Sequence, residues 1–193
     1  MKKIVNPSAC QINKFLRRRY ASKNYTLQEK SLNKLFLKLC PNNKKIEDVL
    51  LKVSALNDFY STNIYDTYSV AENIIKNNID RPLAAGNLDI VNKVARVSVK
   101  RKTINFYSFA TKYCSHHRPK FYPIYDSYVD KMLWYYRKRD QFSDFKRKSL
   151  KEYPVFIEVI NQFKSFYRLN KFKLRDIDNF LWMTGKEYFP NRY

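Results

Sequence analysis

Apolar residues recur at intervals of three and four along almost the whole chain, which is the spacing of one helix face. In the first such segment, Ile12, Phe15 and Leu16 follow Pro7 and Ser8. The same periodicity predicts helices over residues 10–20, 27–39, 46–56, 64–75, 88–97, 106–117, 125–139, 154–167 and 174–188. The chain is therefore expected to contain about nine or ten helices.

Start and stop signals set the predicted ends of several helices. Thr26 is expected to cap the second helix, and Pro41 to end it. Asp126 or Ser127 is the expected N-cap of the helix over 125–139, and Pro154 suits a first helical turn. The stretch over 81–87, which contains a proline and a glycine, is predicted to be a loop.

Scarce glycine bears on the fold class. The chain has only two glycines and seven prolines, so an all-β fold and a glycine-rich phosphate loop are not expected. We predict an all-α fold, a compact bundle that forms a single domain over residues 1–193. Its helices form either one body or two lobes with the candidate site between them. A strand is the alternative to a helix over 94–99, because valine alternates there.

Net charge is the strongest signal in the composition. Lys and Arg number 38 against 17 Asp and Glu, a formal net charge of +21. Such a field attracts polyanions, and neutralising their phosphates releases counterions. We therefore expect nucleic acid to be the partner. The alternatives are a ribosomal or membrane-surface role, or charge that only serves solubility; codons rich in A·T would explain many lysines but not the scarcity of acidic residues.

The cysteines and the N-terminus bear on the compartment. Cys10, Cys40 and Cys114 stand alone without a CxxC pair, so neither a disulfide framework nor a zinc site is expected. No apolar run follows Met1 and its two lysines, so no signal peptide is expected. No stretch approaches the roughly 18 apolar residues that span a membrane. We expect a cytoplasmic monomer with no cofactor, no metal and no membrane partner.

The stretch over 105–130 carries the candidate chemistry. Lys112 falls near the start of one predicted helix, and Asp126 stands at the N-terminus of the next, just after Pro123. Chain reversal through Arg118 and Pro119 would bring the two side chains together. We predict that they face one cleft within ~6 Å, a range at which opposite charges couple.

Two short segments carry a family resemblance. Thr111-Lys112-Tyr113-Cys114 and Pro123-Ile124-Tyr125-Asp126 resemble parts of the helix-hairpin-helix DNA glycosylases, in the 8-oxoguanine DNA glycosylase-like branch. In that family a lysine lies in the helix after the hairpin, and an aspartate heads the next helix. Ser61-Thr62-Asn63-Ile64, at an expected helix start, resembles the segment that helps wedge the DNA. Tyr107-Ser108-Phe109 stands where the family has Gly-x-Gly, so the hairpin is expected to be degenerate.

The resemblance implies a DNA repair glycosylase with AP lyase activity that excises an oxidised base such as 8-oxoguanine. The substrate would be double-stranded DNA with one nucleotide extruded. The neutral amine of Lys112 would attack C1′ and form a Schiff base, and burial or neighbouring cations are the usual means of keeping such an amine neutral. Asp126 would stabilise positive charge on the sugar, or orient and deprotonate the lysine.

Further residues are assigned by their positions in the same stretch and in the last helix. Contacts to DNA are expected from Asn63, Lys100, Arg101, Lys102, His116, His117, Arg118 and Lys120. The base pocket is expected to contain Phe59, Tyr125, Trp182 and Lys186. The alternative functions are a non-catalytic DNA- or RNA-binding module and a bacterial defence component that recognises modified DNA.

Overall fold

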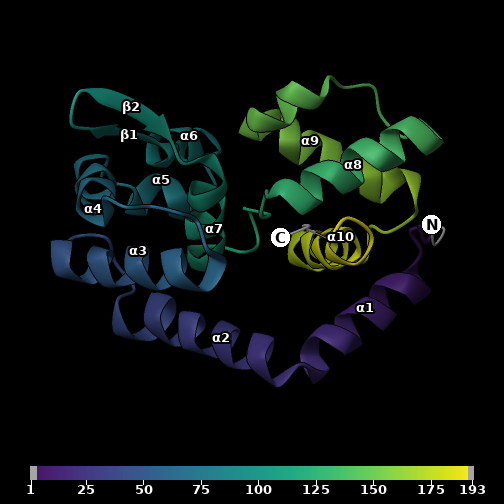
Figure 1. Cartoon of the computed structure of the whole chain (residues 1–193), viewed down its shortest axis with the longest axis horizontal. Coiled ribbons are helices and arrows are strands. Elements are labelled where there is room, and N and C mark those ends of the chain that lie inside the picture. The colour runs from purple at the N-terminus through teal and green to yellow at the C-terminus, as the bar shows by residue number, and fades with distance from the viewer. Residues whose placement is uncertain (1–3, 191–193) are drawn as a thin grey trace. The chain divides into compact units, whose positions relative to one another are not determined.

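Helices dominate the computed structural model, which describes residues 4–190 (Figure 1). Within those residues there are ten α-helices and one two-stranded sheet, so the all-α prediction is confirmed. The chain divides into two compact units. Unit 1 contains the residues up to Lys23 and those from Pro123 onward, and unit 2 is Asn24–Tyr122.

Unit 2 surrounds one buried helix, α7 (Tyr107–His117). All of its residues except Ser108 are buried, and it packs against α6, α3 and the π-helical turn η1. The elements that precede it are α2 (Lys23–Lys34, the first residue lying in unit 1), η1 (Leu35–Leu39), α3 (Ile46–Tyr60), α4 (Thr67–Lys76), α5 (Asp80–Ala84) and α6 (Asp89–Ala95). Because α7 carries Lys112, the core of unit 2 fixes the position of that lysine.

A β-hairpin joins α6 to α7. Strands β1 (Arg96–Val99) and β2 (Lys102–Asn105) pair antiparallel, with Val99 opposite Lys102, so the turn has two residues. Val97 is buried on β1, whereas every residue of β2 is exposed. The helix predicted over 88–97 is therefore wrong beyond Ala95, and the strand alternative is correct for 96–99. The alternating valines favour a strand with one buried face.

Three other sequence predictions for unit 2 are wrong. Thr26 lies inside α2 and does not cap it, and a short helix, α5, occupies part of the predicted loop over 81–87. The helix expected from Ile64 begins at Thr67. Asp66 is its N-cap and accepts a hydrogen bond from the Ser69 N–H, a stronger start signal than the apolar residues before it. The segment over 61–64 is therefore not a helix start.

Unit 1 is built around α10 (Leu174–Tyr188), which packs against α1 (Ala9–Ala21), α8 (Ser127–Asp140) and α9 (Tyr153–Phe166). A 3-10 helix, η2 (Arg147–Lys151), leads into α9. A Cβ added at Gly185 would lie 2.7 Å from the Tyr128 Cβ, so this glycine allows α10 to approach α8 closely. The predicted N-cap at Asp126 and the proline in the first turn of α9 are both confirmed.

No helix in the described part of the chain has the length and apolar character needed to cross a bilayer.

Candidate functional site

Lys112 has its side chain in the interior of unit 2. The residue is 4% exposed, and its Nζ lies 2.5 Å from the Ser108 Oγ and 3.3 Å from the Ser108 carbonyl oxygen. The Nζ also lies 5.4 Å from the ring centroid of Tyr60 on α3. The burial of this lysine is unusual, because Lys is almost never fully buried unless it is paired.

His116 stands one helical turn beyond Lys112. Its Nε2 lies 2.9 Å from the hydroxyl of Tyr60, the same tyrosine whose ring faces the lysine. Phe36 of η1 packs against the ring of His116. Tyr60 therefore links the lysine and the histidine, and both His116 and His117 are buried, at 6% and 3% exposure. The sequence predicts that both histidines contact DNA, whereas both side chains are buried.

A second buried lysine, Lys52, lies on α3 and reaches the end of α7. Its ammonium donates to the carbonyl oxygens of Cys40 and Asn42 and to the Asn43 Oδ1, and it lies 3.4 Å from the His117 Nε2. Burial lowers the pKa of Lys52 to about 8, partly opposed by the charge of Asp80. Burial also lowers the pKa of His117 well below its ordinary value, and the charges of Lys52 and Arg118 lower it further. His117 is therefore a neutral ring at physiological pH.

Asn43 connects this network to α5 and α7. Its backbone N–H and side-chain amide both donate to the carboxylate of Asp80, and the Tyr113 hydroxyl donates to its Oδ1. This network is not predicted from the sequence. The available signal was Lys52 itself, which occupies the apolar face of α3 shared by Val49, Val53 and Leu56.

Asp126, in unit 1, caps α8. One of its carboxylate oxygens accepts hydrogen bonds from the N–H groups of Tyr128 and Val129. The turn before it is also held: the Ile124 N–H donates to the buried carboxylate of Asp178, and the Tyr153 hydroxyl donates to the Pro123 carbonyl. Burial raises the pKa of Asp178 to about 6, opposed by Arg175, the Ile124 N–H and Arg19. Hydrogen bonds to the residues before Asp126 and from the first turn of α8 after it thus hold Asp126 in place.

Lys112 and Asp126 belong to different units. Each is described within its own unit, so the prediction that they face one cleft stays a prediction.

The residues proposed for the base pocket are also divided between the units. Phe59 is half-buried on α3 of unit 2. Tyr125, in unit 1, is buried, and its hydroxyl donates to the Asp130 Oδ1. On α10, the Lys186 Nζ lies 5.2 Å from the ring centroid of the half-buried Trp182. Trp182 and Lys186 therefore contact each other on α10, and the hydroxyl of Tyr125 is engaged in a buried hydrogen bond with Asp130.

The expected DNA contacts at Asn63 and the hairpin turn lie on one side of unit 2. Lys100, Arg101 and Lys102 are exposed at the turn, and Lys100 has a left-handed backbone with φ of 55°. Hydrogen bonds from Ser69 lower the pKa of Asp66, and the charge of nearby Lys100 lowers it further. Since Asp66 follows Asn63 in the same loop, the hairpin turn and this loop are neighbours.

The two remaining cations follow α7. Arg118 and Lys120 are both exposed. A guanidinium nitrogen of Arg118 donates to the His117 carbonyl oxygen, and the Lys120 Nζ lies 5.5 Å from the ring centroid of Phe121. Because both side chains are exposed, an anion in solution can reach them. Among the described residues, no group of three or more His, Cys, Asp or Glu side chains is placed to hold a metal ion.

Comparisons with known proteins identify the family. A family model described as HI_0787_N, an N-terminal domain, matches residues 11–121. An uncharacterised protein of Haemophilus influenzae is 45% identical over 146 residues, which cover 75% of this chain and 70% of that protein. The chain therefore belongs to the HI_0787_N family. The matched range ends within one residue of the end of unit 2, so it includes Lys112 and the hairpin but not Asp126. No solved structure matches the chain.

Proposed function

We propose that this protein is a DNA glycosylase with AP lyase activity that uses Lys112 as its nucleophile. The observation that carries the proposal is the burial of the Lys112 amine against Ser108 and the ring of Tyr60. Withdrawing an ammonium from water costs free energy, so a buried lysine is a candidate functional residue.

The order of elements supports the same proposal. The helix that carries Lys112 directly follows a hairpin, and the next helix begins at an aspartate N-cap. In the glycosylases that the sequence resembles, the lysine and the aspartate occupy those positions. Here the hairpin is a short two-stranded sheet whose turn carries exposed cations, and Tyr107-Ser108-Phe109, which stand where the family has its glycines, form the first turn of α7. Phosphate would therefore be bound by side chains.

The reaction begins with the extruded nucleotide. The lone pair of the Lys112 amine attacks C1′ of the sugar, the N-glycosidic bond breaks, and its electron pair leaves with the base, which takes up a proton. Opening of the sugar ring gives a Schiff base between the lysine and C1′. A proton is then lost from C2′, its electron pair forms the C2′–C3′ double bond, and the 3′ phosphate leaves, which cleaves the strand. Asp126 stabilises positive charge on the sugar as the base departs.

Borohydride trapping tests the proposal. The full-length protein is incubated with a duplex that contains 8-oxoguanine, and separately with one that contains an abasic site. Borohydride reduces a Schiff base to a stable amine, so we expect a covalent protein–DNA band that is absent for Lys112→Gln. Lys30→Gln, at an exposed lysine on α2, is the matched control and should trap like the unaltered protein. The band would also be lost if Lys112→Gln did not fold. Thermal unfolding of the variant and of the unaltered protein checks that both are folded.

A non-catalytic nucleic-acid-binding protein is the second candidate. The exposed cations of the hairpin turn favour this candidate, because side chains of this kind bind phosphate whether or not the protein has a catalytic lysine. Tight DNA binding without an adduct on either duplex and without base release would contradict the glycosylase proposal and favour this one.

A further inference from the structure

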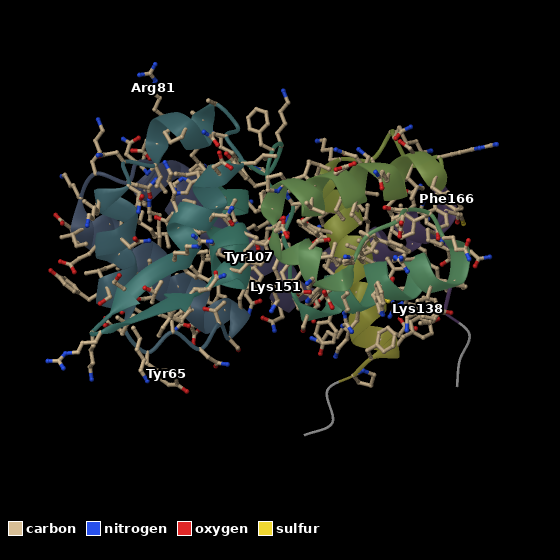
Figure 2. The ribbon with its side chains drawn as sticks, turned by 90° about the horizontal axis from the view of Figure 1, so that it is seen from above. Tyr65, Arg81, Tyr107, Lys138, Lys151 and Phe166 are labelled. Carbon is tan, nitrogen blue, oxygen red and sulfur yellow. The ribbon has the colours of Figure 1, made fainter. Side chains whose placement is uncertain are left out.

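Two tyrosines of unit 2 are exposed around the start of α4. Tyr65 is 98% exposed and Tyr68 is 55% exposed, although a tyrosine ring gains free energy when it is buried. Figure 2 shows Tyr65 projecting away from the helices of its unit. The two residues flank Asp66, the N-cap of α4, so they are carried at the start of a fixed helix.

The backbone around these tyrosines is held firmly. Asn57 of α3 accepts a hydrogen bond from the Ile64 N–H and donates one to the Ile64 carbonyl. Ser69 donates twice to the Asp66 carboxylate. Hydrogen bonding to Glu72 raises the pKa of the Tyr68 hydroxyl and ties its ring to the surface of α4. A rigid segment that presents exposed rings has little entropy left to lose on binding.

The hairpin turn places cations beside the tyrosines. Strand β1, which leads into the hairpin turn, packs against α4, the helix that carries Tyr68 and follows Tyr65. Lys100 of the turn is near enough to the α4 N-cap, Asp66, for its charge to add to the lowering of the Asp66 pKa by Ser69. A groove beside them is lined by Tyr68, Glu72, Asn73 and Lys76 of α4 and by Ser98 of β1. The cations of the turn and of Lys76 outnumber Asp66 and Glu72, so the surface as a whole favours an anion.

We propose that the rings of Tyr65 and Tyr68 and the cations of the hairpin turn form a binding surface for unpaired DNA bases and their phosphates. Exposed rings next to cations are the usual composition of surfaces that bind single strands, since every base offers a π face and every nucleotide a phosphate. The inference rests on the proposed function only in taking DNA as the partner.

Fluorescence anisotropy with the full-length protein tests the inference. The probes are a labelled 20-nucleotide oligothymidine and a labelled 20-base-pair duplex. Tyr65→Ala and Tyr68→Ala are each expected to weaken binding of the single strand about tenfold, and to weaken binding of the duplex much less. Phe166→Ala, at a 51% exposed aromatic residue of α9, is the matched control and should bind both probes normally.

The outcome separates the inference from the proposed function. If Tyr65→Ala and Tyr68→Ala both bind the single strand within twofold of the unaltered protein, or lose both probes equally, the stacking surface is wrong. Tighter binding of oligouridine than of oligothymidine would overturn the assignment to DNA. If the tyrosine variants lose the single strand while no borohydride adduct forms on Lys112, the inference stands and the glycosylase proposal fails.

Discussion

Asp178 is a buried carboxylate whose protonation should affect stability. Its folded pKa of about 6 lies above the ordinary value of 3.8, so between pH 4 and 6 the native state binds more protons than the unfolded state. The contribution of this group to stability is full at low pH and is lost as the pH rises through 6. The effect amounts to at most about 3 kcal/mol, because each pKa unit corresponds to roughly 1.4 kcal/mol.

Asp178→Asn keeps an oxygen that can accept from the Ile124 N–H but removes the titration. We expect the free energy of unfolding of the variant, relative to the unaltered protein, to rise between pH 4 and 6 and then level off. Denaturant unfolding across this range measures the difference. A difference that stays constant with pH would contradict the raised pKa.

At the scale of residues, the sequence predicted some side chains and missed others. Asp126 was identified as a cap because capping is local and depends on adjacent N–H groups. The network of Lys52, Asn43 and Asp80 was missed, since its members are separated by up to 37 positions and meet only after folding. The burial of His116 and His117 was missed for the same reason, because α3 and η1 cover α7 from elsewhere in the chain.

At the scale of elements, α8 offers a way to separate capping from chemistry. Asp126→Ala removes the acceptor for two N–H groups and should lower the free energy of unfolding by about 1 kcal/mol. Asp126→Asn should retain most of that stability, because asparagine caps helices about as well. Thermal unfolding compares the two.

The same pair of variants tests the proposed role of the charge. If Asp126 stabilises the sugar cation, both variants should reduce the yield of the borohydride adduct, although only Asp126→Ala is less stable. An adduct yield for Asp126→Asn equal to that of the unaltered protein would assign Asp126 to capping alone.

Long helices with local caps were predicted well from the sequence, and short elements were not. The helix over Leu174–Tyr188 and the start of α9 follow from apolar spacing and from Pro154. The sequence offers one strand over 94–99 as an alternative and does not predict the hairpin, because its turn has neither glycine nor asparagine; Lys100 adopts the left-handed backbone instead. The five residues of α5 are too few to show a helical period.

At the scale of the whole molecule, the net charge of +21 predicts a strong salt dependence of DNA binding. For a duplex, the logarithm of the association constant falls with that of the salt concentration by roughly 0.9 per neutralised phosphate. Replacing Lys100, Arg101 and Lys102 together with glutamine removes three expected phosphate contacts and should reduce this slope by roughly 2.7. The matched control replaces Lys14, Lys30 and Lys38, which are exposed on α1, α2 and η1. Equal slopes for the two triple variants would remove the hairpin turn from the DNA contact.

The central claim is that Lys112 is the nucleophile, and the site of the covalent bond tests it most directly. The trapped complex is digested with protease and nuclease, and the modified peptide is located by tandem mass spectrometry. We expect a reduced sugar remnant on the Nζ of Lys112, within the peptide from α7. A remnant on another lysine or on the N-terminal amine, with Lys112 unmodified, would contradict the account.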